Sequence, residues 1–445
     1  MKKILVLGAG RSSSSLIRYL LDHARSCEWT VTVGDVSIEN ALQKTGSSDV
    51  AKAVQFDIGR QEEARKIIRD ADIVVSLLPP ALHPAVAIHC LEEGKHFLTA
   101  SYVSAELRDL HSEVRRKGLV FVNECGLDPG LDHLSAMKVI DNIRGHGGTI
   151  TSFESFTGGL IAPETDPENP WRYKFTWNPR NVVTAGQRTA KYRHDGKSKY
   201  IPYQQLFRRL TPVEVPGYGH YEGYANRNSL QYIDAYGLNG VATMLRGTLR
   251  NKGFCSAWDL LVQMGCCDDT YSMEQVSRMT HAIFIESFLR PVSNCSTVEE
   301  KVSAHFGLKP DSAEIRMLKW SGFFDDEPIG LPEGTPAQIT EHILNKRWAL
   351  QKGDRDQIVM WHRFRYQIQG VGKEIQAYLV ATGSDEIFTA MAKTVGLPLA
   401  IATKLVAQEQ IQARGVLLPL TPEFYEPILT ELASFEITLT ENEVR

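Results

Sequence analysis

A glycine turn between an apolar run and a helical pattern opens this chain, and it constrains the fold more than any other feature. Residues 4–7 are apolar, and the run GAGRSS follows at once at residues 8–13. Such a turn lets backbone N–H groups at a helix N-terminus approach a pyrophosphate. A tight strand-to-helix turn in any α/β protein is the alternative, because the third glycine of the usual fingerprint is a serine. We predict dinucleotide contacts from Gly8, Gly10, Arg11, Ser12 and Ser13.

Short apolar runs alternate with helical patterns up to about residue 122. This alternation is typical of a parallel sheet covered by helices on both faces. It therefore predicts an α/β fold with a Rossmann doubly wound parallel sheet. The predicted strands are 4–7, 30–34, 53–56, 73–77, 96–99 and 119–122, and the predicted helices are 13–24, 62–69, 84–93 and 105–117.

Asp35 ends the second predicted strand, where an acidic side chain can accept the ribose hydroxyls of an adenosine. A carboxylate there repels a 2′-phosphate, which favours NAD as the cofactor, with NADP possible. The alternative for Asp35 is an N-cap of the next helix. Leu78 and Pro79 follow the fourth strand, and we expect both to pack against adenosine or ribose. His83 opens the next helix either as a polar cap or as a catalytic acid.

Polar loops follow the fifth and sixth predicted strands, at residues 101–104 and 123–133. Parallel strands deliver both loops to one edge of the sheet, where the nicotinamide would lie. Asp128 either contacts the substrate or caps the following helix. Similar alternatives stay open for Glu124, Asp132 and His133, and His133 is either a packed structural imidazole or an acid or base.

The alternation stops after about residue 147, and 445 residues exceed what one hydrophobic core usually serves. We predict a strand at 149–156, a hairpin at 192–201, strands at 358–366 and 374–380, and a closing helix at 386–410. The resulting domains are a Rossmann domain (1–125, joined by 390–445), a second mixed α+β substrate and dimerisation domain (126–253 with 351–389) and an inserted helical domain (254–350).

Charge and cysteine usage exclude some classes of partner. Lys and Arg total 49 against 53 Asp and Glu, so the net charge of −4 gives no footprint for nucleic acid. The first apolar run is too short for a signal peptide or a membrane span. Seven cysteines without a C-x-x-C spacing predict no metal site and fit reduced thiols. We expect a cytoplasmic protein with a small-molecule substrate.

Six segments together resemble the glutamate-forming saccharopine dehydrogenases, also called saccharopine reductases. The resemblance runs nearly end to end and implies the reversible reaction of saccharopine, nicotinamide cofactor and water to L-glutamate and 2-aminoadipate 6-semialdehyde, in a homodimer. It also implies that Ser101, Tyr102, Asp128, Gly159, Arg227 and Arg246 line the saccharopine site. The segments are SYVS (101–104), NECGLDPGLDH (123–133), TGGLIAPE (157–164), YKFTW (173–177), RGTLR (246–250) and GLPLAIATKL (396–405).

The chemistry of saccharopine agrees with these residues. Its three carboxylates suit arginines, and Asp128, supported by Tyr102, is our candidate for handling the proton of its secondary amine. Fungal members of the family have a cysteine at the position of Thr157 and an arginine-containing second-strand end for NADP. Gly34-Asp35-Val36 stands there instead, which favours NAD and a role in oxidative lysine breakdown.

Two other functions stay open from the sequence. A relative acting on another C–N bond, such as lysine 6-dehydrogenase or a carboxynorspermidine dehydrogenase, would share the fold. Arg227 and Arg246 distinguish these functions, because arginines suit a substrate with carboxylates, whereas a polyamine would be bound by carboxylate side chains. A non-catalytic nicotinamide-binding sensor would keep the glycine turn, although it has little use for the polar loops.

Overall fold

The computed structural model describes residues 1–291 and 295–444. The chain forms two compact units, and each is described by itself. Unit 1 comprises Met1–Thr149, Ile368–Val371 and Leu379–Glu441, and unit 2 comprises Ile150–Gln367, Gly372–Tyr378 and Asn442–Arg445. The helices between residues 254 and 350 fall in unit 2. The boundaries of the three predicted domains remain a prediction.

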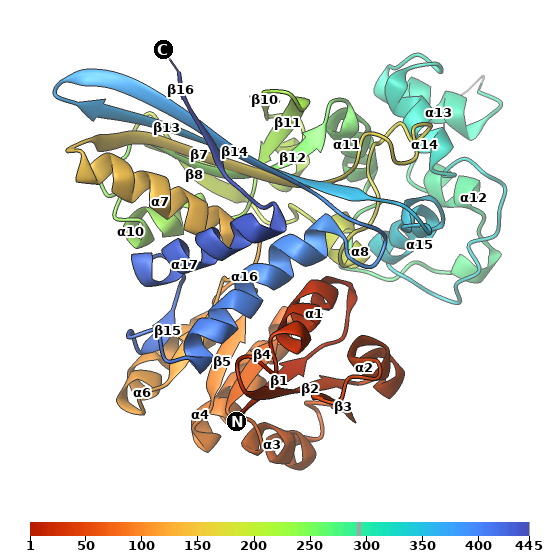
Figure 1. Cartoon of the computed structure of the whole chain (residues 1–445). Helices are drawn as coiled ribbons and strands as arrows, with labels where there is room; N and C mark the ends of the chain where they lie inside the picture. The colour runs from red at the N-terminus through yellow and green to blue at the C-terminus, as the bar shows by residue number, and fades with distance from the viewer. Residues whose placement is uncertain (292–294, 445) are drawn as a thin grey trace. The chain divides into compact units, whose positions relative to one another are not determined.

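Unit 1 contains a seven-stranded sheet in the order β15-β6-β5-β4-β1-β2-β3, and all of its neighbouring strands are parallel (Figure 1). The central strands β1, β4, β5 and β6 are buried runs rich in Ile, Val, Leu and Phe, as parallel strands covered on both faces require, whereas the edge strands β3 and β15 are less buried. All six strands predicted in the first third are present, so the Rossmann prediction is confirmed. Their bounds are β1 Lys2–Leu7, β2 Trp29–Asp35, β3 Ala51–Gln55, β4 Ile73–Ser76, β5 His96–Thr99, β6 Val120–Val122 and β15 Gly415–Leu417.

Helices follow these strands, and the predicted helix at 105–117 is in fact two. Leu110 is both the C-cap of α5 and the N-cap of α6, so the chain turns there. The closing helix was predicted too long, at 386–410, because α16 spans only Ala390–Ala407. Two further helices, α17 and η5, follow it. The helices of unit 1 are η1 Arg11–Ser13, α1 Ser14–Asp22, α2 Ile38–Thr45, α3 Gln61–Arg69, η2 Pro80–Leu82, α4 His83–Glu93, α5 Ala105–Asp109, α6 His111–Arg116, α7 Leu131–Gly145, α16 Ala390–Ala407, α17 Pro422–Leu432 and η5 Ala433–Phe435.

Helix α16 packs closely on α1 and forms part of the core of unit 1. A Cβ atom at Gly396 would lie 2.9 Å from the backbone nitrogen of Leu16, so only glycine allows this approach. The helix is long and apolar enough to cross a membrane, yet 78% of that stretch is buried inside the structure. Its apolar composition is therefore explained by packing.

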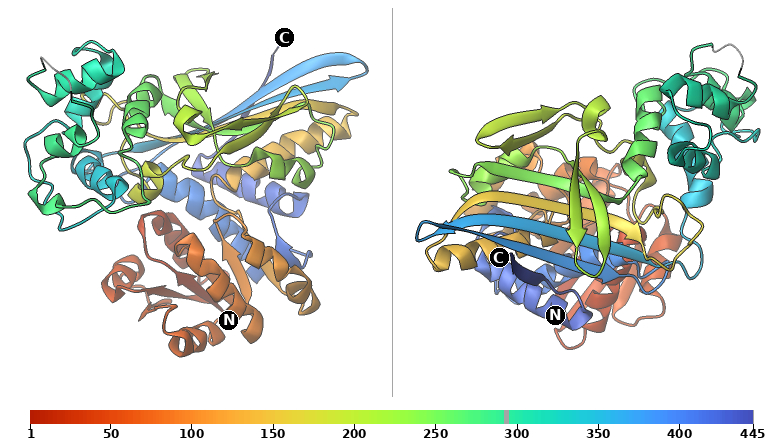
Figure 2. Two further views of the ribbon diagram at one scale, coloured as in Figure 1. Left: turned by 180° about the vertical axis from the view of Figure 1, so that it is seen from behind. Right: turned by 90° about the horizontal axis from the view of Figure 1, so that it is seen from above.

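Most of a second, mixed sheet belongs to unit 2; its main order is β10-β11-β12-β7-β13-β14-β16, and the hairpin β8–β9 lies off this path. Strands β7 and β12 pair in parallel, whereas β11 and β12 are antiparallel. The right-hand view of Figure 2 shows the long strands β7, in gold, and β13 and β14, in blue. The bounds are β7 Thr149–Ile161, β8 Ala190–His194, β9 Lys197–Ile201, β10 Leu210–Val215, β11 Gly219–Ala225, β12 Thr243–Asn251, β13 Asp356–Ile368, β14 Val371–Thr382 and β16 Thr440–Val444.

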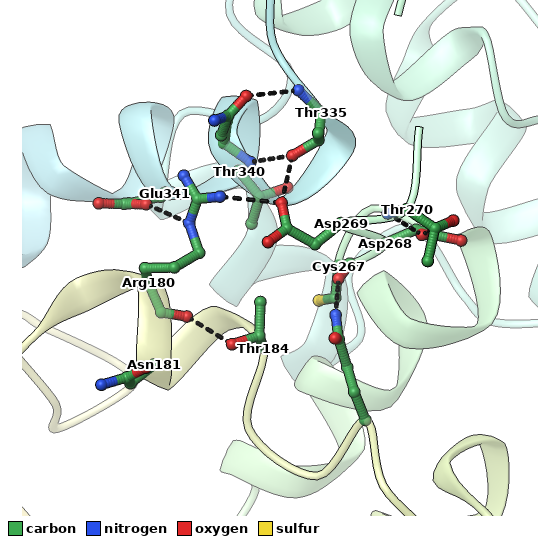
Figure 3. Close-up of polar contacts among 12 residues, drawn as sticks. Arg180, Asn181, Thr184, Cys267, Asp268, Asp269, Thr270, Thr335, Thr340 and Glu341 are labelled. Atoms are coloured by element: carbon green, nitrogen blue, oxygen red, sulfur yellow. Dashed lines mark hydrogen bonds and ion pairs between the residues drawn. The ribbon is translucent and has the colours of Figure 1, made fainter. Parts of the chain in front are cut away.

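The predicted helical stretch is confirmed, and a polar cluster ties it to an earlier segment (Figure 3). Arg180 donates to Glu341 at 2.7 Å and to Asp269 at 2.9 Å, so one guanidinium joins α8 to α15 and to the loop after α11. Thr335 caps α15 and also donates to Asp269. The helices of unit 2 are α8 Pro179–Val183, α9 Tyr203–Leu206, η3 Ser229–Gln231, α10 Tyr232–Ala235, α11 Phe254–Met264, η4 Val276–Arg278, α12 His281–Glu286, α13 Val298–Phe306, α14 Ala313–Trp320 and α15 Pro336–Trp348.

Candidate functional site

The glycine turn after β1 has the geometry of a phosphate cradle. Gly8 has φ +100°, and a Cβ atom there would lie 2.9 Å from the carbonyl oxygen of Leu77. Nothing lies within 4 Å of the position that a Cβ of Gly10 would take, which leaves open space in front of the turn. The turn then enters η1 and α1, and the positive end of the helix dipole at such a helix N-terminus favours an anion. These residues therefore fit the pyrophosphate of a dinucleotide.

Ser13 replaces the third glycine without disturbing the turn. Its side chain is buried, and its hydroxyl donates to the Gly10 carbonyl at 2.8 Å, so it closes the turn locally. Arg11 is exposed and Ser12 is half-buried at the start of η1. Both follow the glycine turn directly, and their contacts with the cofactor remain predictions.

Asp35 ends β2 beside this turn, and its carboxylate accepts the Ala9 N–H at 2.7 Å. It also accepts the Ser37 N–H at 3.0 Å. The N-cap of α2 is Ser37, whose hydroxyl accepts from Asn40, so the N-cap alternative for Asp35 is wrong. The Asn40 side chain adds a long contact at 3.5 Å. A carboxylate has about four acceptor positions, so these three donors leave room for a ribose hydroxyl.

Leu78 and Pro79 follow β4 next to the glycine turn. Leu78 is half-buried and packs against the core of unit 1, while Pro79 is exposed. Leu78 thus has a packing role in the core besides its predicted contact with adenosine or ribose. The cofactor contacts of both residues remain predictions.

The loops after β5 and β6 meet through a hydrogen bond between the two predicted catalytic residues. Tyr102 donates its phenolic proton to Asp128 Oδ1 at 2.8 Å. Helix α7 begins after Gly130, so Asp128 is not its N-cap, and the capping alternative is wrong. Asp132 instead accepts the Gly130 N–H at 2.7 Å. Ser101 precedes Tyr102, so three predicted site residues lie in one place.

Two glycines allow the tight loop that carries Asp128. The Leu131 N–H bonds the Gly126 carbonyl at 2.7 Å, and the Gly126 N–H bonds the Pro129 carbonyl at 2.9 Å. A Cβ atom on Gly130, which has φ +146°, would lie 2.1 Å from the Gly126 nitrogen. Burial raises the pKa of the neighbouring Cys125 to about 12, so this thiol stays protonated and is no nucleophile.

Glu124 and His133 form a fully buried pair behind this loop. His133 Nε2 lies 2.9 Å from Glu124 Oε2, and both side chains have no exposed surface. Glu124 also accepts the Val103 N–H at 3.1 Å and donates its own N–H to the Ser101 carbonyl at 3.0 Å. The pair therefore anchors the backbone on both sides of Tyr102, which favours a supporting role.

His83 is neither a cap nor an acid at neutral pH. The N-cap of α4 is Leu82, and the His83 ring is buried at 1% exposure. Burial lowers its pKa to about 4, so the imidazole is uncharged at neutral pH. Its nitrogens contact the hydroxyls of Ser76 at 3.0 Å and Ser101 at 2.8 Å. Sequence reasoning missed this contact, because the three residues come from different elements.

The predicted arginines lie in unit 2, around strand β12. Arg246 is 6% exposed and its guanidinium carbon lies 4.3 Å from the centre of the Tyr232 ring. The Asn226 N–H bonds the Arg246 carbonyl at 2.9 Å, which places the loop of exposed Arg227 beside this strand. Gly159 is half-buried on β7, the other neighbour of β12. The structure therefore groups these three residues within unit 2.

The sheet face that carries Arg246 is polar and largely buried. Arg246 pairs with Ser155 of β7, and Thr248 pairs with Thr157, so these side chains point to one side. Thr157 is 6% exposed, and among the described residues its hydroxyl has no hydrogen-bond partner. Arg250, two positions beyond Thr248 on the same face, is 5% exposed and forms no ion pair within the described chain. Its guanidinium carbon lies 4.9 Å from the Tyr173 ring centre.

Models of known families match both parts of the chain. The saccharopine dehydrogenase C-terminal domain matches residues 126–437, and the saccharopine dehydrogenase NADP binding domain matches residues 4–122. The chain belongs to the saccharopine dehydrogenase family. The resemblance found in the sequence is thereby confirmed.

Curated members of the family align with nearly the whole chain. The saccharopine dehydrogenase [NADP(+), L-glutamate-forming] of Saccharomyces cerevisiae is 34% identical over 97% of this chain and 96% of its own length. The mitochondrial alpha-aminoadipic semialdehyde synthase of Bos taurus is 34% identical over 99% of this chain and 47% of its own length. The chain thus spans about half the length of this mammalian relative.

Solved structures agree with the fold. The apo L-Glu-forming saccharopine dehydrogenase of Saccharomyces cerevisiae has a TM-score of 0.89 and 32% identity, with complete coverage of both chains. A homospermidine synthase from Legionella pneumophila has a TM-score of 0.56 over the whole chain at 11% identity, which shows a shared fold alone.

Proposed function

We propose that this chain converts saccharopine, water and an oxidised nicotinamide cofactor reversibly into L-glutamate and 2-aminoadipate 6-semialdehyde. The observation that carries the proposal is the Tyr102–Asp128 hydrogen bond on the loops after β5 and β6. It puts an acceptor for a proton at the edge of the sheet where a Rossmann fold presents the nicotinamide. The names of the fungal relatives, which align over nearly their whole length, support the choice of substrate.

The proposed chemistry assigns proton handling to the protein. When bound, an oxidised nicotinamide would supply the hydride acceptor for the lysine-derived carbon attached to the secondary amine of saccharopine. Asp128 keeps that amine unprotonated, directly or through water, and Tyr102 orients the carboxylate by donating to it. Water then adds to the same carbon, the carbon–nitrogen bond breaks, and the nitrogen leaves with glutamate. One proton is released for each hydride transferred.

The substrate carboxylates are assigned to guanidinium groups of unit 2. Saccharopine has three carboxylates, and we propose that Arg227 and Arg246 hold two of them. Arg250 is a candidate for the third, because it is a buried cation with aromatic neighbours and no carboxylate partner in the described chain. Ser101 and Gly159 complete the proposed contacts.

NAD is the proposed cofactor, with NADP as the alternative that the names of the fungal relatives favour. The Asp35 carboxylate is fixed against the Ala9 N–H at 2.7 Å, so a 2′-phosphate on the adenosine ribose would meet a negative charge. A role in oxidative lysine breakdown is part of this proposal.

The setting of the enzyme is also part of the proposal. All seven cysteines lack a disulfide partner, which fits a reducing compartment such as the cytoplasm. We propose a homodimer on the resemblance to the family. We expect no nucleic-acid or membrane partner.

A turnover assay tests the proposal directly. Purified protein is mixed with saccharopine and either NAD or NADP, the absorbance of reduced cofactor is followed, and glutamate is assayed. We expect reduction of NAD with one glutamate per cofactor. Turnover with NADP alone would overturn the role of Asp35 but keep the reaction. If folded, cofactor-binding protein shows no turnover, the result would favour lysine or carboxynorspermidine as the substrate, or a non-catalytic sensor function.

A further inference from the structure

His83 lies at the centre of a buried group of hydroxyls at the carboxyl edge of the parallel sheet. Its Nδ1 contacts Ser76 Oγ at 3.0 Å, where β4 ends. Its Nε2 contacts Ser101 Oγ at 2.8 Å and Thr99 Oγ1 at 3.3 Å, where β5 ends. The imidazole thus connects two neighbouring strand ends with the loop that carries the proposed substrate contacts.

An uncharged imidazole is well suited to this bridge. It has one N–H donor and one acceptor nitrogen, so it can satisfy one hydroxyl on each side of the ring. Ser76 and Thr99 are completely buried, and within the described residues the Ser76 hydroxyl has no hydrogen-bond partner other than His83. Phe97 covers one side of the ring edge-on, at 6.2 Å between ring centres. The ring is therefore fixed in position.

Ser101 is held at its backbone as well, which leaves its hydroxyl as the adjustable group. The Ser101 N–H donates to Thr99 Oγ1 at 3.2 Å, and its carbonyl accepts from the Glu124 N–H at 3.0 Å. A serine hydroxyl can make about three hydrogen bonds, and His83 takes one. The remaining capacity of this half-buried side chain can serve a ligand.

We propose that His83 is a positioning residue of this enzyme, which fixes the rotamer of Ser101 so that the serine hydroxyl meets a polar group of the substrate. The proposal rests on the proposed function, because Ser101 contacts substrate only if that function is right. His83 itself touches no reacting atom in this proposal. It acts by reducing the conformational freedom that Ser101 would otherwise lose on binding.

A double-mutant cycle tests the action through Ser101. His83→Phe removes the hydrogen bond and keeps a ring, and we expect kcat/KM for saccharopine to fall about tenfold with the dinucleotide Kd unchanged. Ser101→Ala should cost a similar factor, and the double variant should lose no more than Ser101→Ala alone. His83→Gln, which can still donate or accept, should recover most of the activity.

A histidine on the same helix provides the matched control. His89 also belongs to α4, and its Nδ1 lies 3.8 Å from Glu92 Oε2 on the same helix. His89→Gln should leave kcat/KM unchanged. Multiplicative losses in the double variant, or unchanged kcat/KM in His83→Phe, would overturn the proposal.

A second readout separates this inference from the proposed function. If wild-type protein fails to turn over saccharopine, the proposed function is wrong, yet the His83–Ser101 contact can still be tested. In protein labelled with 15N-histidine, Ser101→Ala should shift the resonance of His83 Nε2 much more than that of Nδ1. An unchanged Nε2 resonance would refute the positioning contact whatever the substrate is.

Discussion

Single residues at the edge of the parallel sheet are defined by their buried partners. Tyr102 bonds Asp128, Glu124 bonds His133 and His83 bonds Ser101, so three contacts fix one loop region. Buried polar groups that lose a partner are costly. Substitutions here should therefore change function or stability measurably, and each effect has a named contact behind it.

Asp35 is expected to select the cofactor. Asp35→Ala removes the proposed ribose acceptor, so the Kd for NAD should rise about tenfold. It also removes the charge that opposes a 2′-phosphate, so the preference for NAD over NADP should become smaller. Titration of the intrinsic fluorescence with each dinucleotide measures both constants. Asp57→Ala, at the exposed aspartate that follows β3, is the control and should leave them unchanged. Equal NAD affinity in Asp35→Ala would contradict the assignment.

Arg246 is expected to bind substrate and not cofactor. Arg246→Ala should raise the KM for saccharopine about ten- to hundredfold, because one charge-assisted contact with a carboxylate is lost. Steady-state kinetics at saturating NAD measure this effect, and the dinucleotide Kd should stay constant. Arg209→Ala removes an exposed arginine and serves as the control. An unaltered KM would remove Arg246 from the site.

His83 is also expected to make stability depend on pH. Burial lowers its pKa from 6.5 to about 4 in the folded state, so the unfolded chain binds more protons between these values. Above about pH 6.5, His83 protonation has no effect on the free energy of unfolding. As the pH falls towards 4, it lowers that free energy by up to about 3 kcal/mol. Urea unfolding of wild type and His83→Gln at about pH 7.5, above both pKa values, and at about pH 5, between them, isolates this contribution. The wild type should lose more stability than the variant on acidification, and equal losses would contradict the burial argument.

At the scale of elements, close approaches and polar ties determine the packing within each unit. Gly396 allows α16 to lie against α1 in unit 1. Arg180 joins α8 to α15 and the loop after α11 in unit 2 (Figure 3). The GLPLAIATKL segment lies in the predicted closing helix that joins the Rossmann domain, and the structure adds its close approach to α1 at Gly396.

Alanine at Gly396 is expected to destabilise unit 1. Its Cβ would lie 2.9 Å from the Leu16 nitrogen, so the helices must separate, at a cost of about 1–3 kcal/mol. Gly145→Ala is a matched control in the last turn of α7, where nothing lies within 4 Å of the new Cβ. That substitution should raise stability slightly. Thermal denaturation compares the two, and a stabilised Gly396→Ala variant would contradict the close packing.

For the whole molecule, ligand binding should appear as added stability. A dinucleotide that binds only the folded chain raises its stability by about 2.7 kcal/mol at one hundred times Kd. NAD should therefore raise the Tm, and saccharopine should raise it further when both are present. Scanning fluorimetry measures this, with a polyamine as the control ligand. A larger shift with the polyamine than with saccharopine would favour the alternative C–N substrates.

Most of the fold could be predicted from the sequence, because local patterns decide where strands and helices form. Periodicity and turn residues predicted the positions of the first six strands along the chain, the β8–β9 hairpin and the helical stretch after residue 254. The break at Leu110 and the short elements after α16 could not be predicted, since weak local patterns are decided by the contacts they make.

The sequence by itself determined the dinucleotide fold, the family and the residues around which a site can form, because glycine turns, apolar periodicity and motif order are local properties. Only the tertiary structure decided which of these side chains have partners. Asp35 and Asp128 are not helix caps, and His83 is an uncharged bridge to Ser101. Such roles depend on burial and on groups distant in sequence, which no local pattern specifies.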